Sequence, residues 1–68
     1  MITAFDLLQE MQTWVDVPES LLENAKKAKI NESNNAEFAT LLDDWCSGVY
    51  DNDPDQVVNE IEFIINNA

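Results

Sequence analysis

Apolar residues in this 68-residue chain recur at intervals of three and four positions, and this spacing restricts what the chain can fold into. In the clearest segment, residues 36–47, an apolar face combines Phe38, Leu41, Leu42 and Trp45. The whole chain has only one Gly and two Pro, too few for the many turns of a sheet protein. The sequence therefore predicts an all-α fold, a small bundle of three to four short helices in a single domain, residues 1–68.

Capping residues and a proline define the first two predicted helices. Thr3 is a candidate N-cap, with Asp6 in the first turn, for a helix that runs to about Val15. Pro18 breaks this helix and begins a second, which runs to about Lys29. Acidic residues lie early and lysines late in the second helix, as the helix macrodipole favours. Because its apolar face is thin, we expect it to be the most peripheral helix.

The second half of the chain has its own helix signals. The polar run 31–35 predicts a loop before the third helix. Asp53, Pro54 and Gln56 form the N-cap, first residue and capping-box partner of a fourth helix, which ends near Asn66. Adjacent apolar pairs at period 3.6, rather than alternation, favour a helix over a strand here.

Bulky and small apolar residues supply the predicted core. The bulky candidates are Phe5, Trp14, Phe38, Trp45, Tyr50 and Phe63. The fourth helix contributes a stripe of Val57, Val58, Ile61, Ile64 and Ile65. Val49 extends the stripe of the third helix, Gly48 is a candidate C′ residue after that helix, and Cys46 is expected at the core edge.

Negative charge is distributed unevenly. The chain has 14 acidic residues against three lysines, a net charge of −11, and the lysines are Lys26, Lys27 and Lys29. From Ile30 onward there are nine acidic residues and no Lys, Arg or His. Such a surface repels nucleic acid and anionic membranes and attracts basic protein surfaces. We therefore expect a basic protein partner, with no direct nucleic-acid or membrane binding.

The residues that enzymes use most often for catalysis are scarce. The chain has no His, and Cys46 has acidic neighbours that disfavour an activated thiolate. We expect a binding protein rather than an enzyme, without a cofactor. A single cysteine, no recognisable signal peptide and no apolar run of about 20 residues predict a cytoplasmic protein.

One stretch resembles an EF-hand calcium loop. Counted from Asp51, oxygen-bearing side chains fall at loop positions 1, 3, 5, 9 and 12, the last being Glu62. The stretch departs from that family at position 6, where Gln56 replaces the glycine of the sharp turn. The helix-cap interpretation explains Asp53, Pro54 and Gln56 together. Calcium binding is therefore the weaker alternative, and no metal site is predicted.

The acidic surface suggests a function. Part of it is helix capping, but capping does not explain the missing lysines over 39 residues. We interpret the chain as an inhibitor or regulator of a nucleic-acid-handling protein, whose carboxylates imitate phosphates in the manner of anti-restriction, anti-CRISPR or nuclease-inhibitor proteins. The predicted contact set is Asp43, Asp44, Tyr50, Asp51, Asp53, Asp55, Glu60 and Glu62.

The main alternative assigns function to apolar residues. In it the chain is a helical interaction module, or a homodimer, and its acids only keep it in solution. The exposed seam would then involve Leu21, Leu22, Trp14 or Tyr50.

Overall fold

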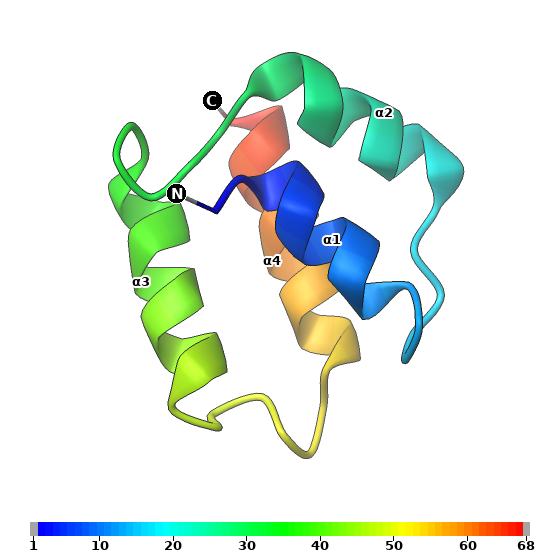
Figure 1. Ribbon diagram of the computed structural model, residues 1–68, viewed down its shortest axis with the longest axis vertical. Helices are drawn as coiled ribbons and strands as arrows, with labels where there is room; N and C mark the ends of the chain where they lie inside the picture. The colour runs from blue at the N-terminus through cyan, green and yellow to red at the C-terminus, as the bar shows by residue number, and fades with distance from the viewer. Residues whose placement is uncertain (1, 68) are drawn as a thin grey trace.

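A computed structural model describes residues 2–67, and every regular element in that range is an α-helix (Figure 1). The order is α1 (Ala4–Met11), α2 (Glu19–Ala28), α3 (Ala36–Cys46) and α4 (Asp55–Asn66). The radius of gyration is 10.7 Å, close to the roughly 11 Å of a compact domain of this length. The predicted all-α bundle of short helices is confirmed.

Helix α1 begins as predicted and ends early. The Thr3 hydroxyl accepts a hydrogen bond from the Asp6 amide at 3.0 Å, and the Asp6 carboxylate accepts one from the Thr3 amide at 3.2 Å, so the two residues form a capping box. The predicted last turn, to Val15, is instead a tight turn in which the Trp14 amide donates to the Met11 carbonyl. Pro18 disfavours helical backbone only at Val17, so it accounts for the break before α2 but not for the earlier end of α1 at Met11.

Helix α2 is bounded as predicted, between Pro18 and Lys29. Lys29 adopts the left-handed conformation, with φ 55°, and ends the helix. Only Leu21 and Ala25 of this helix are buried, which agrees with a peripheral position. Beyond it, the carbonyl of Ile30 accepts a hydrogen bond from the amide of Ala4 and so ties this segment to the start of α1.

The polar run 31–35 is a loop held by its own asparagines. The Asn31 side chain accepts hydrogen bonds from the amides of Ser33 and Asn34. Asn35 caps α3 by accepting from the Phe38 amide at 3.0 Å. Asn31 thus satisfies backbone donors of the loop itself, and Asn35 satisfies one that the start of α3 leaves open.

Helices α3 and α4 differ in how they are capped. After α3, Gly48 takes a positive φ of 88°, as predicted for a C′ glycine. At the start of α4 the predicted Asp53 cap is wrong: Pro54 occupies the cap position and no side chain caps the helix. The chain enters α4 through a tight turn in which the Gln56 amide donates to the Asp53 carbonyl, so the aspartate contributes its backbone and not its carboxylate.

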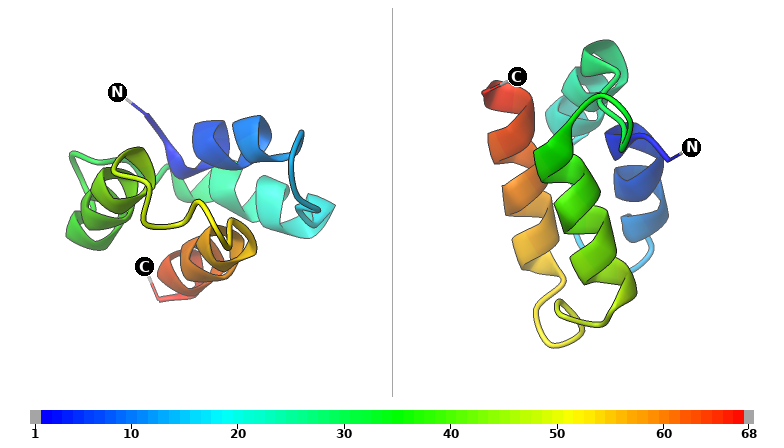
Figure 2. Two further views of the ribbon diagram at one scale, coloured as in Figure 1. Left: turned by 90° about the horizontal axis from the view of Figure 1, so that it is seen from below. Right: turned by 90° about the vertical axis from the view of Figure 1, so that its left-hand side faces the viewer.

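The helices pack as two pairs joined through α4. Helices α3 and α4 lie side by side and run in opposite directions, with residues 47–54 closing one end (Figures 1 and 2). Helix α1 packs against α2, and α2 also contacts α4. Among residues 2–67, no helix combines the length and apolarity that crossing a membrane requires.

The core is mainly aliphatic. Its largest fully buried side chains are Phe38, Leu8, Met11, Ile61 and Val57. Of the six bulky aromatic candidates only Phe38 is buried, and the prediction is wrong for Trp14 and Phe63, which are 58% and 63% exposed. The prediction is also wrong for Val49, which is 64% exposed in the loop after α3, and for the exposed Cys46. These four side chains lie at a helix end, in a loop or off the apolar stripe, where no other helix packs over them.

Candidate functional site

The predicted contact residues all lie at the surface. No polar or charged residue is buried anywhere in residues 2–67. Within the predicted set, Asp44 and Tyr50 are half-buried and the other six residues are exposed. The carboxylates therefore face solvent and are accessible to a partner.

The connection between α3 and α4 gathers part of this set at one end of the bundle (Figure 1). Its backbone turns are tight: the Val49 amide donates to the Asp44 carbonyl, and the Asp51 amide donates to the Gly48 carbonyl. The side chain of Asp51 folds back over Gly48, where a Cβ would lie 3.0 Å from the carboxylate oxygen. Gly48 thus permits both the positive φ and the position of this carboxylate.

Tyr50 lies among carboxylates from both helices. Partial burial raises the pKa of Tyr50 above its ordinary value of 10.0, and the negative charges of Glu60 and Asp44 raise it further. A charge on the last turn of α3 and one on the middle of α4 thus act on the same phenol. The structure brings together these three members of the predicted set.

The remaining members do not form one patch with Tyr50. Successive helical residues point about 100° apart. Glu62 therefore projects about 200° away from Glu60 around α4, and Asp43 projects about 100° away from Asp44 on α3. The predicted contact set is divided between at least two faces, and its coherent part lies around the loop.

A pair of stacked tryptophans borders this loop, and no pattern in the sequence predicts it. The ring centroids of Trp14 and Trp45 are 5.7 Å apart, with 29° between the ring planes. Trp45 is half-buried against the core, whereas Trp14 is 58% exposed. The apolar spacing correctly placed Trp45 on the inner stripe of α3. Nothing in the sequence predicted that the turn after α1 would bring Trp14 over it.

The stacked pair lines a shallow hollow of about 300 Å³. Tyr50, Asp51 and Pro54 form the rest of its lining. Three aromatic side chains and a carboxylate therefore converge at the surface. This combination of flat apolar faces and negative charge favours a cationic group.

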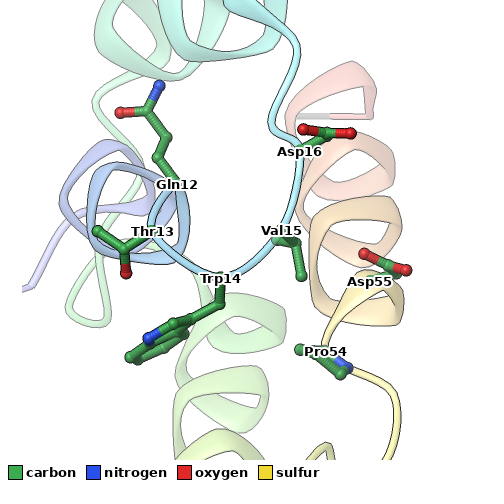
Figure 3. Close-up of a pocket in the computed structure, with 7 residues that line it drawn as sticks. All are labelled: Gln12, Thr13, Trp14, Val15, Asp16, Pro54 and Asp55. Carbon is green, nitrogen blue, oxygen red and sulfur yellow. The ribbon is translucent and has the colours of Figure 1, made fainter.

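A second hollow, of about 560 Å³, also has Trp14 in its lining (Figure 3). Asp16 and Asp55 stand along one side of it, and Gln12 and Thr13 along the other. Trp14 and Pro54 line both hollows. Trp14 is thus an exposed aromatic ridge shared by two hollows that each contain at least one carboxylate, and Asp16 joins the acidic surface without having been predicted.

Phe63 marks a separate surface. It is 63% exposed and lines a third hollow, of about 320 Å³, with Asn59 and Glu60. Glu60, which lines this hollow, also acts on Tyr50, but no residue lines both this hollow and the one beside Trp45.

The stretch that resembles a calcium loop is not a loop over most of its length. Residues 55–66 belong to α4, so Asn59 and Glu62 lie on a helix. Within residues 2–67, no group of three or more His, Cys, Asp or Glu side chains is placed to hold a metal ion. The geometry that an EF-hand requires is therefore not formed.

Comparison of the chain with protein-family models, with curated proteins and with solved structures gives no match.

Proposed function

We propose that this protein binds a basic surface of a nucleic-acid-handling protein, and regulates or inhibits it by occupying the place of nucleic acid. The observation that carries the proposal is the exposed Trp14 ridge, which lines two hollows that each contain at least one carboxylate. Tryptophan and tyrosine are the side chains that most often dominate binding energy at protein interfaces. The surrounding carboxylates, Asp16, Asp51 and Asp55, would supply charge complementarity.

The fold makes little use of the carboxylates of Asp51 and Asp53, which supports the proposal. Asp6 caps α1, and Glu32 accepts a hydrogen bond from the Ile2 amide at 3.1 Å. In contrast, Asp53 does not cap α4 with its side chain, and it is exposed together with Asp51. Self-repulsion among such charges lowers stability. A binding role explains why they are present.

The carboxylates and the aromatic ridge would act at different stages of binding. The charge of −11 would steer a positively charged groove toward the protein and raise the association rate, most strongly at low salt. Trp14 would then lose water as it enters the interface and slow dissociation. The expected complex therefore forms fast, weakens with salt and needs both kinds of side chain.

A homodimer is the second candidate, because Trp14, Val49 and Phe63 leave apolar surface exposed. Leu21, named in the predicted seam, is buried and Leu22 is half-buried, so Leu21 at least does not contribute. Two copies would bring a charge of −11 against another of −11, which opposes association at low salt. Sedimentation under reducing conditions separates the candidates: dimerisation lost in Trp14→Ala would support the homodimer, and a monomer would exclude it.

Affinity capture tests the proposal. The immobilised protein is exposed to host extract at low and at high salt, and bound proteins are eluted with duplex DNA. We expect a basic nucleic-acid-binding protein to be retained at low salt only and to be released by the DNA. The Asp51→Lys, Asp53→Lys double variant should lose at least tenfold in affinity for the captured protein.

A second double variant controls for the change in net charge alone. Glu10→Lys with Glu23→Lys makes the same change of net charge at exposed positions on α1 and α2. It should retain most of the affinity, while circular dichroism confirms that both variants are folded. Equal losses in the two variants, or capture that DNA does not reverse, would contradict the proposal.

A further inference from the structure

The hollow beside Trp45 has the lining that a planar cation requires. The two tryptophans and Tyr50 provide aromatic surface, Pro54 adds an apolar wall, and Asp51 adds a carboxylate. A cation near the face of an aromatic ring is attracted by the ring electrons, and tryptophan is the strongest partner. The molecule already contains such a pair: the Lys26 ammonium nitrogen lies 6.0 Å from the centroid of the Phe5 ring.

We propose that this hollow receives the guanidinium group of an arginine side chain on the partner. Guanidinium is flat and delocalised, so it stacks on an indole face and still donates paired hydrogen bonds to a carboxylate. A lysine ammonium is a compact, strongly hydrated charge that gains less from a flat, open aromatic surface. The hollow therefore selects arginine over lysine at equal charge. This inference rests on the proposed function, which it deepens by naming the group that Trp14, Trp45 and Asp51 contact.

Two neighbouring carboxylates strengthen the site. Asp44 and Glu60 act on Tyr50, whose ring lines the hollow, so the local potential is more negative than Asp51 alone would make it. A phenol with the ordinary pKa of 10.0 is already protonated at neutral pH, and the raised pKa of Tyr50 moves its titration further from neutrality. Its hydroxyl therefore keeps both a donor and acceptor lone pairs for a bound group.

Short peptides test the inference with the intact protein. The probes are three acetylated five-residue peptides that carry glycine at both ends and lysine at the second and fourth positions. The central residue is arginine, lysine or citrulline, the neutral analogue of arginine. We expect the arginine peptide to bind at least threefold more tightly than the lysine peptide and to shift the indole N–H resonances of both tryptophans. The citrulline peptide should bind most weakly.

Variants show whether the preference belongs to the hollow. Trp14→Ala and Asp51→Asn should each reduce the arginine-over-lysine ratio to near one, whereas Phe63→Ala, at an equally exposed aromatic residue elsewhere, should leave the ratio unchanged. Asp51→Asn keeps the shape of the side chain, so it remains informative even if Trp14→Ala disturbs the turn. A ratio near one in the wild type, or a ratio that survives in Asp51→Asn, overturns the inference.

The two proposals fail separately. If peptides show no arginine preference but partner capture still depends on Asp51 and Asp53, the guanidinium site is wrong and the proposed function stands. If capture does not depend on those carboxylates, the proposed function is wrong, whatever the peptides show.

Discussion

At the scale of single residues, the main difference is whether the neighbouring helices bury a side chain or leave it exposed. Phe38 and Phe63 both lie on helices and have the same side chain, yet one is fully buried and the other is 63% exposed. Phe63 lies about 200° around α4 from the buried Ile61, so helical spacing already placed it away from the core stripe. Composition alone suggested that it was a core residue, and periodicity was the better guide.

Tyr50 offers a direct measurement at this scale, because it is the only tyrosine. Its pKa is raised by burial, then by Glu60 and Asp44, so the folded protein holds the phenol proton more tightly than the unfolded chain does. The resulting stabilisation is complete below the ordinary value of 10.0 and is lost as pH rises through the raised folded pKa. We therefore expect alkaline titration, followed by phenolate absorbance, to reach its midpoint above 10.0.

Two substitutions, and a titration in denaturant, provide the controls for this measurement. Glu60→Gln should lower the Tyr50 pKa more than Asp44→Asn, and neither should restore it fully because burial is the larger cause. In denaturant the phenol should titrate at its ordinary value. A native midpoint at or below that value would show that these groups do not act on Tyr50.

Helices are the scale at which the sequence was most informative. Apolar spacing placed all four, and the boundaries of α2 and α3 agree to within about a residue. The errors fall at two ends, where the outcome depends on tertiary structure: α1 stops at Met11, and Asp53 does not cap α4. The local sequence was compatible with a helix that continues to Val15 and with a cap at Asp53. Instead, the turn that brings Trp14 against Trp45 replaces the last predicted turn of α1.

The candidate site was predicted in part for the same reason. Its charges could be read from the sequence because nearly every carboxylate in a chain with so few lysines must face solvent. The contact between Trp14 and Trp45 joins a turn after α1 to the last part of α3, and no local pattern encodes such a long-range contact. The resulting hollow could be found only in three dimensions.

The end of α2 carries a prediction at the scale of the element. Lys29 has a φ of 55°, a conformation that costs L-residues roughly 1–2 kcal/mol and that glycine adopts freely. Glycine also loses more conformational entropy on folding than lysine does, which offsets part of this gain. Lys29→Gly should therefore stabilise the protein by about 0.5–1 kcal/mol. For a domain of this size that raises Tm by a few degrees, which differential scanning calorimetry can measure.

Lys27→Gly is the matched control, since it removes the same charge from inside the helix. It should destabilise the protein by about 1 kcal/mol, because glycine is a poor residue in a helix interior. If Lys29→Gly were no more stable than the wild type, the left-handed end of α2 would not be strained.

At the scale of the whole molecule, charge and size together determine how stability responds to salt. The described residues span 28 × 24 × 20 Å, and the screening length is about 30 Å at 0.01 M salt but about 10 Å at 0.1 M. At low salt every carboxylate is therefore repelled by nearly every other, whereas at 0.1 M only near neighbours interact. Two like charges 10 Å apart in water repel by roughly 0.4 kcal/mol, so screening a handful of such pairs is worth about 1–2 kcal/mol.

We therefore expect Tm to rise with sodium chloride, by about 4–8 °C for each kcal/mol of repulsion relieved. Most of the rise should occur below about 0.1 M, where the screening length shrinks past the size of the molecule. Glu62→Lys, at an exposed position on α4, should raise Tm at low salt and lose most of this effect at high salt, because it reduces the same repulsion. If salt acted only by strengthening apolar burial, the difference in Tm between variant and wild type would stay constant as salt rises. If Tm did not depend on salt, the net charge of −11 would not destabilise the fold, and a binding role would have no folding cost to explain.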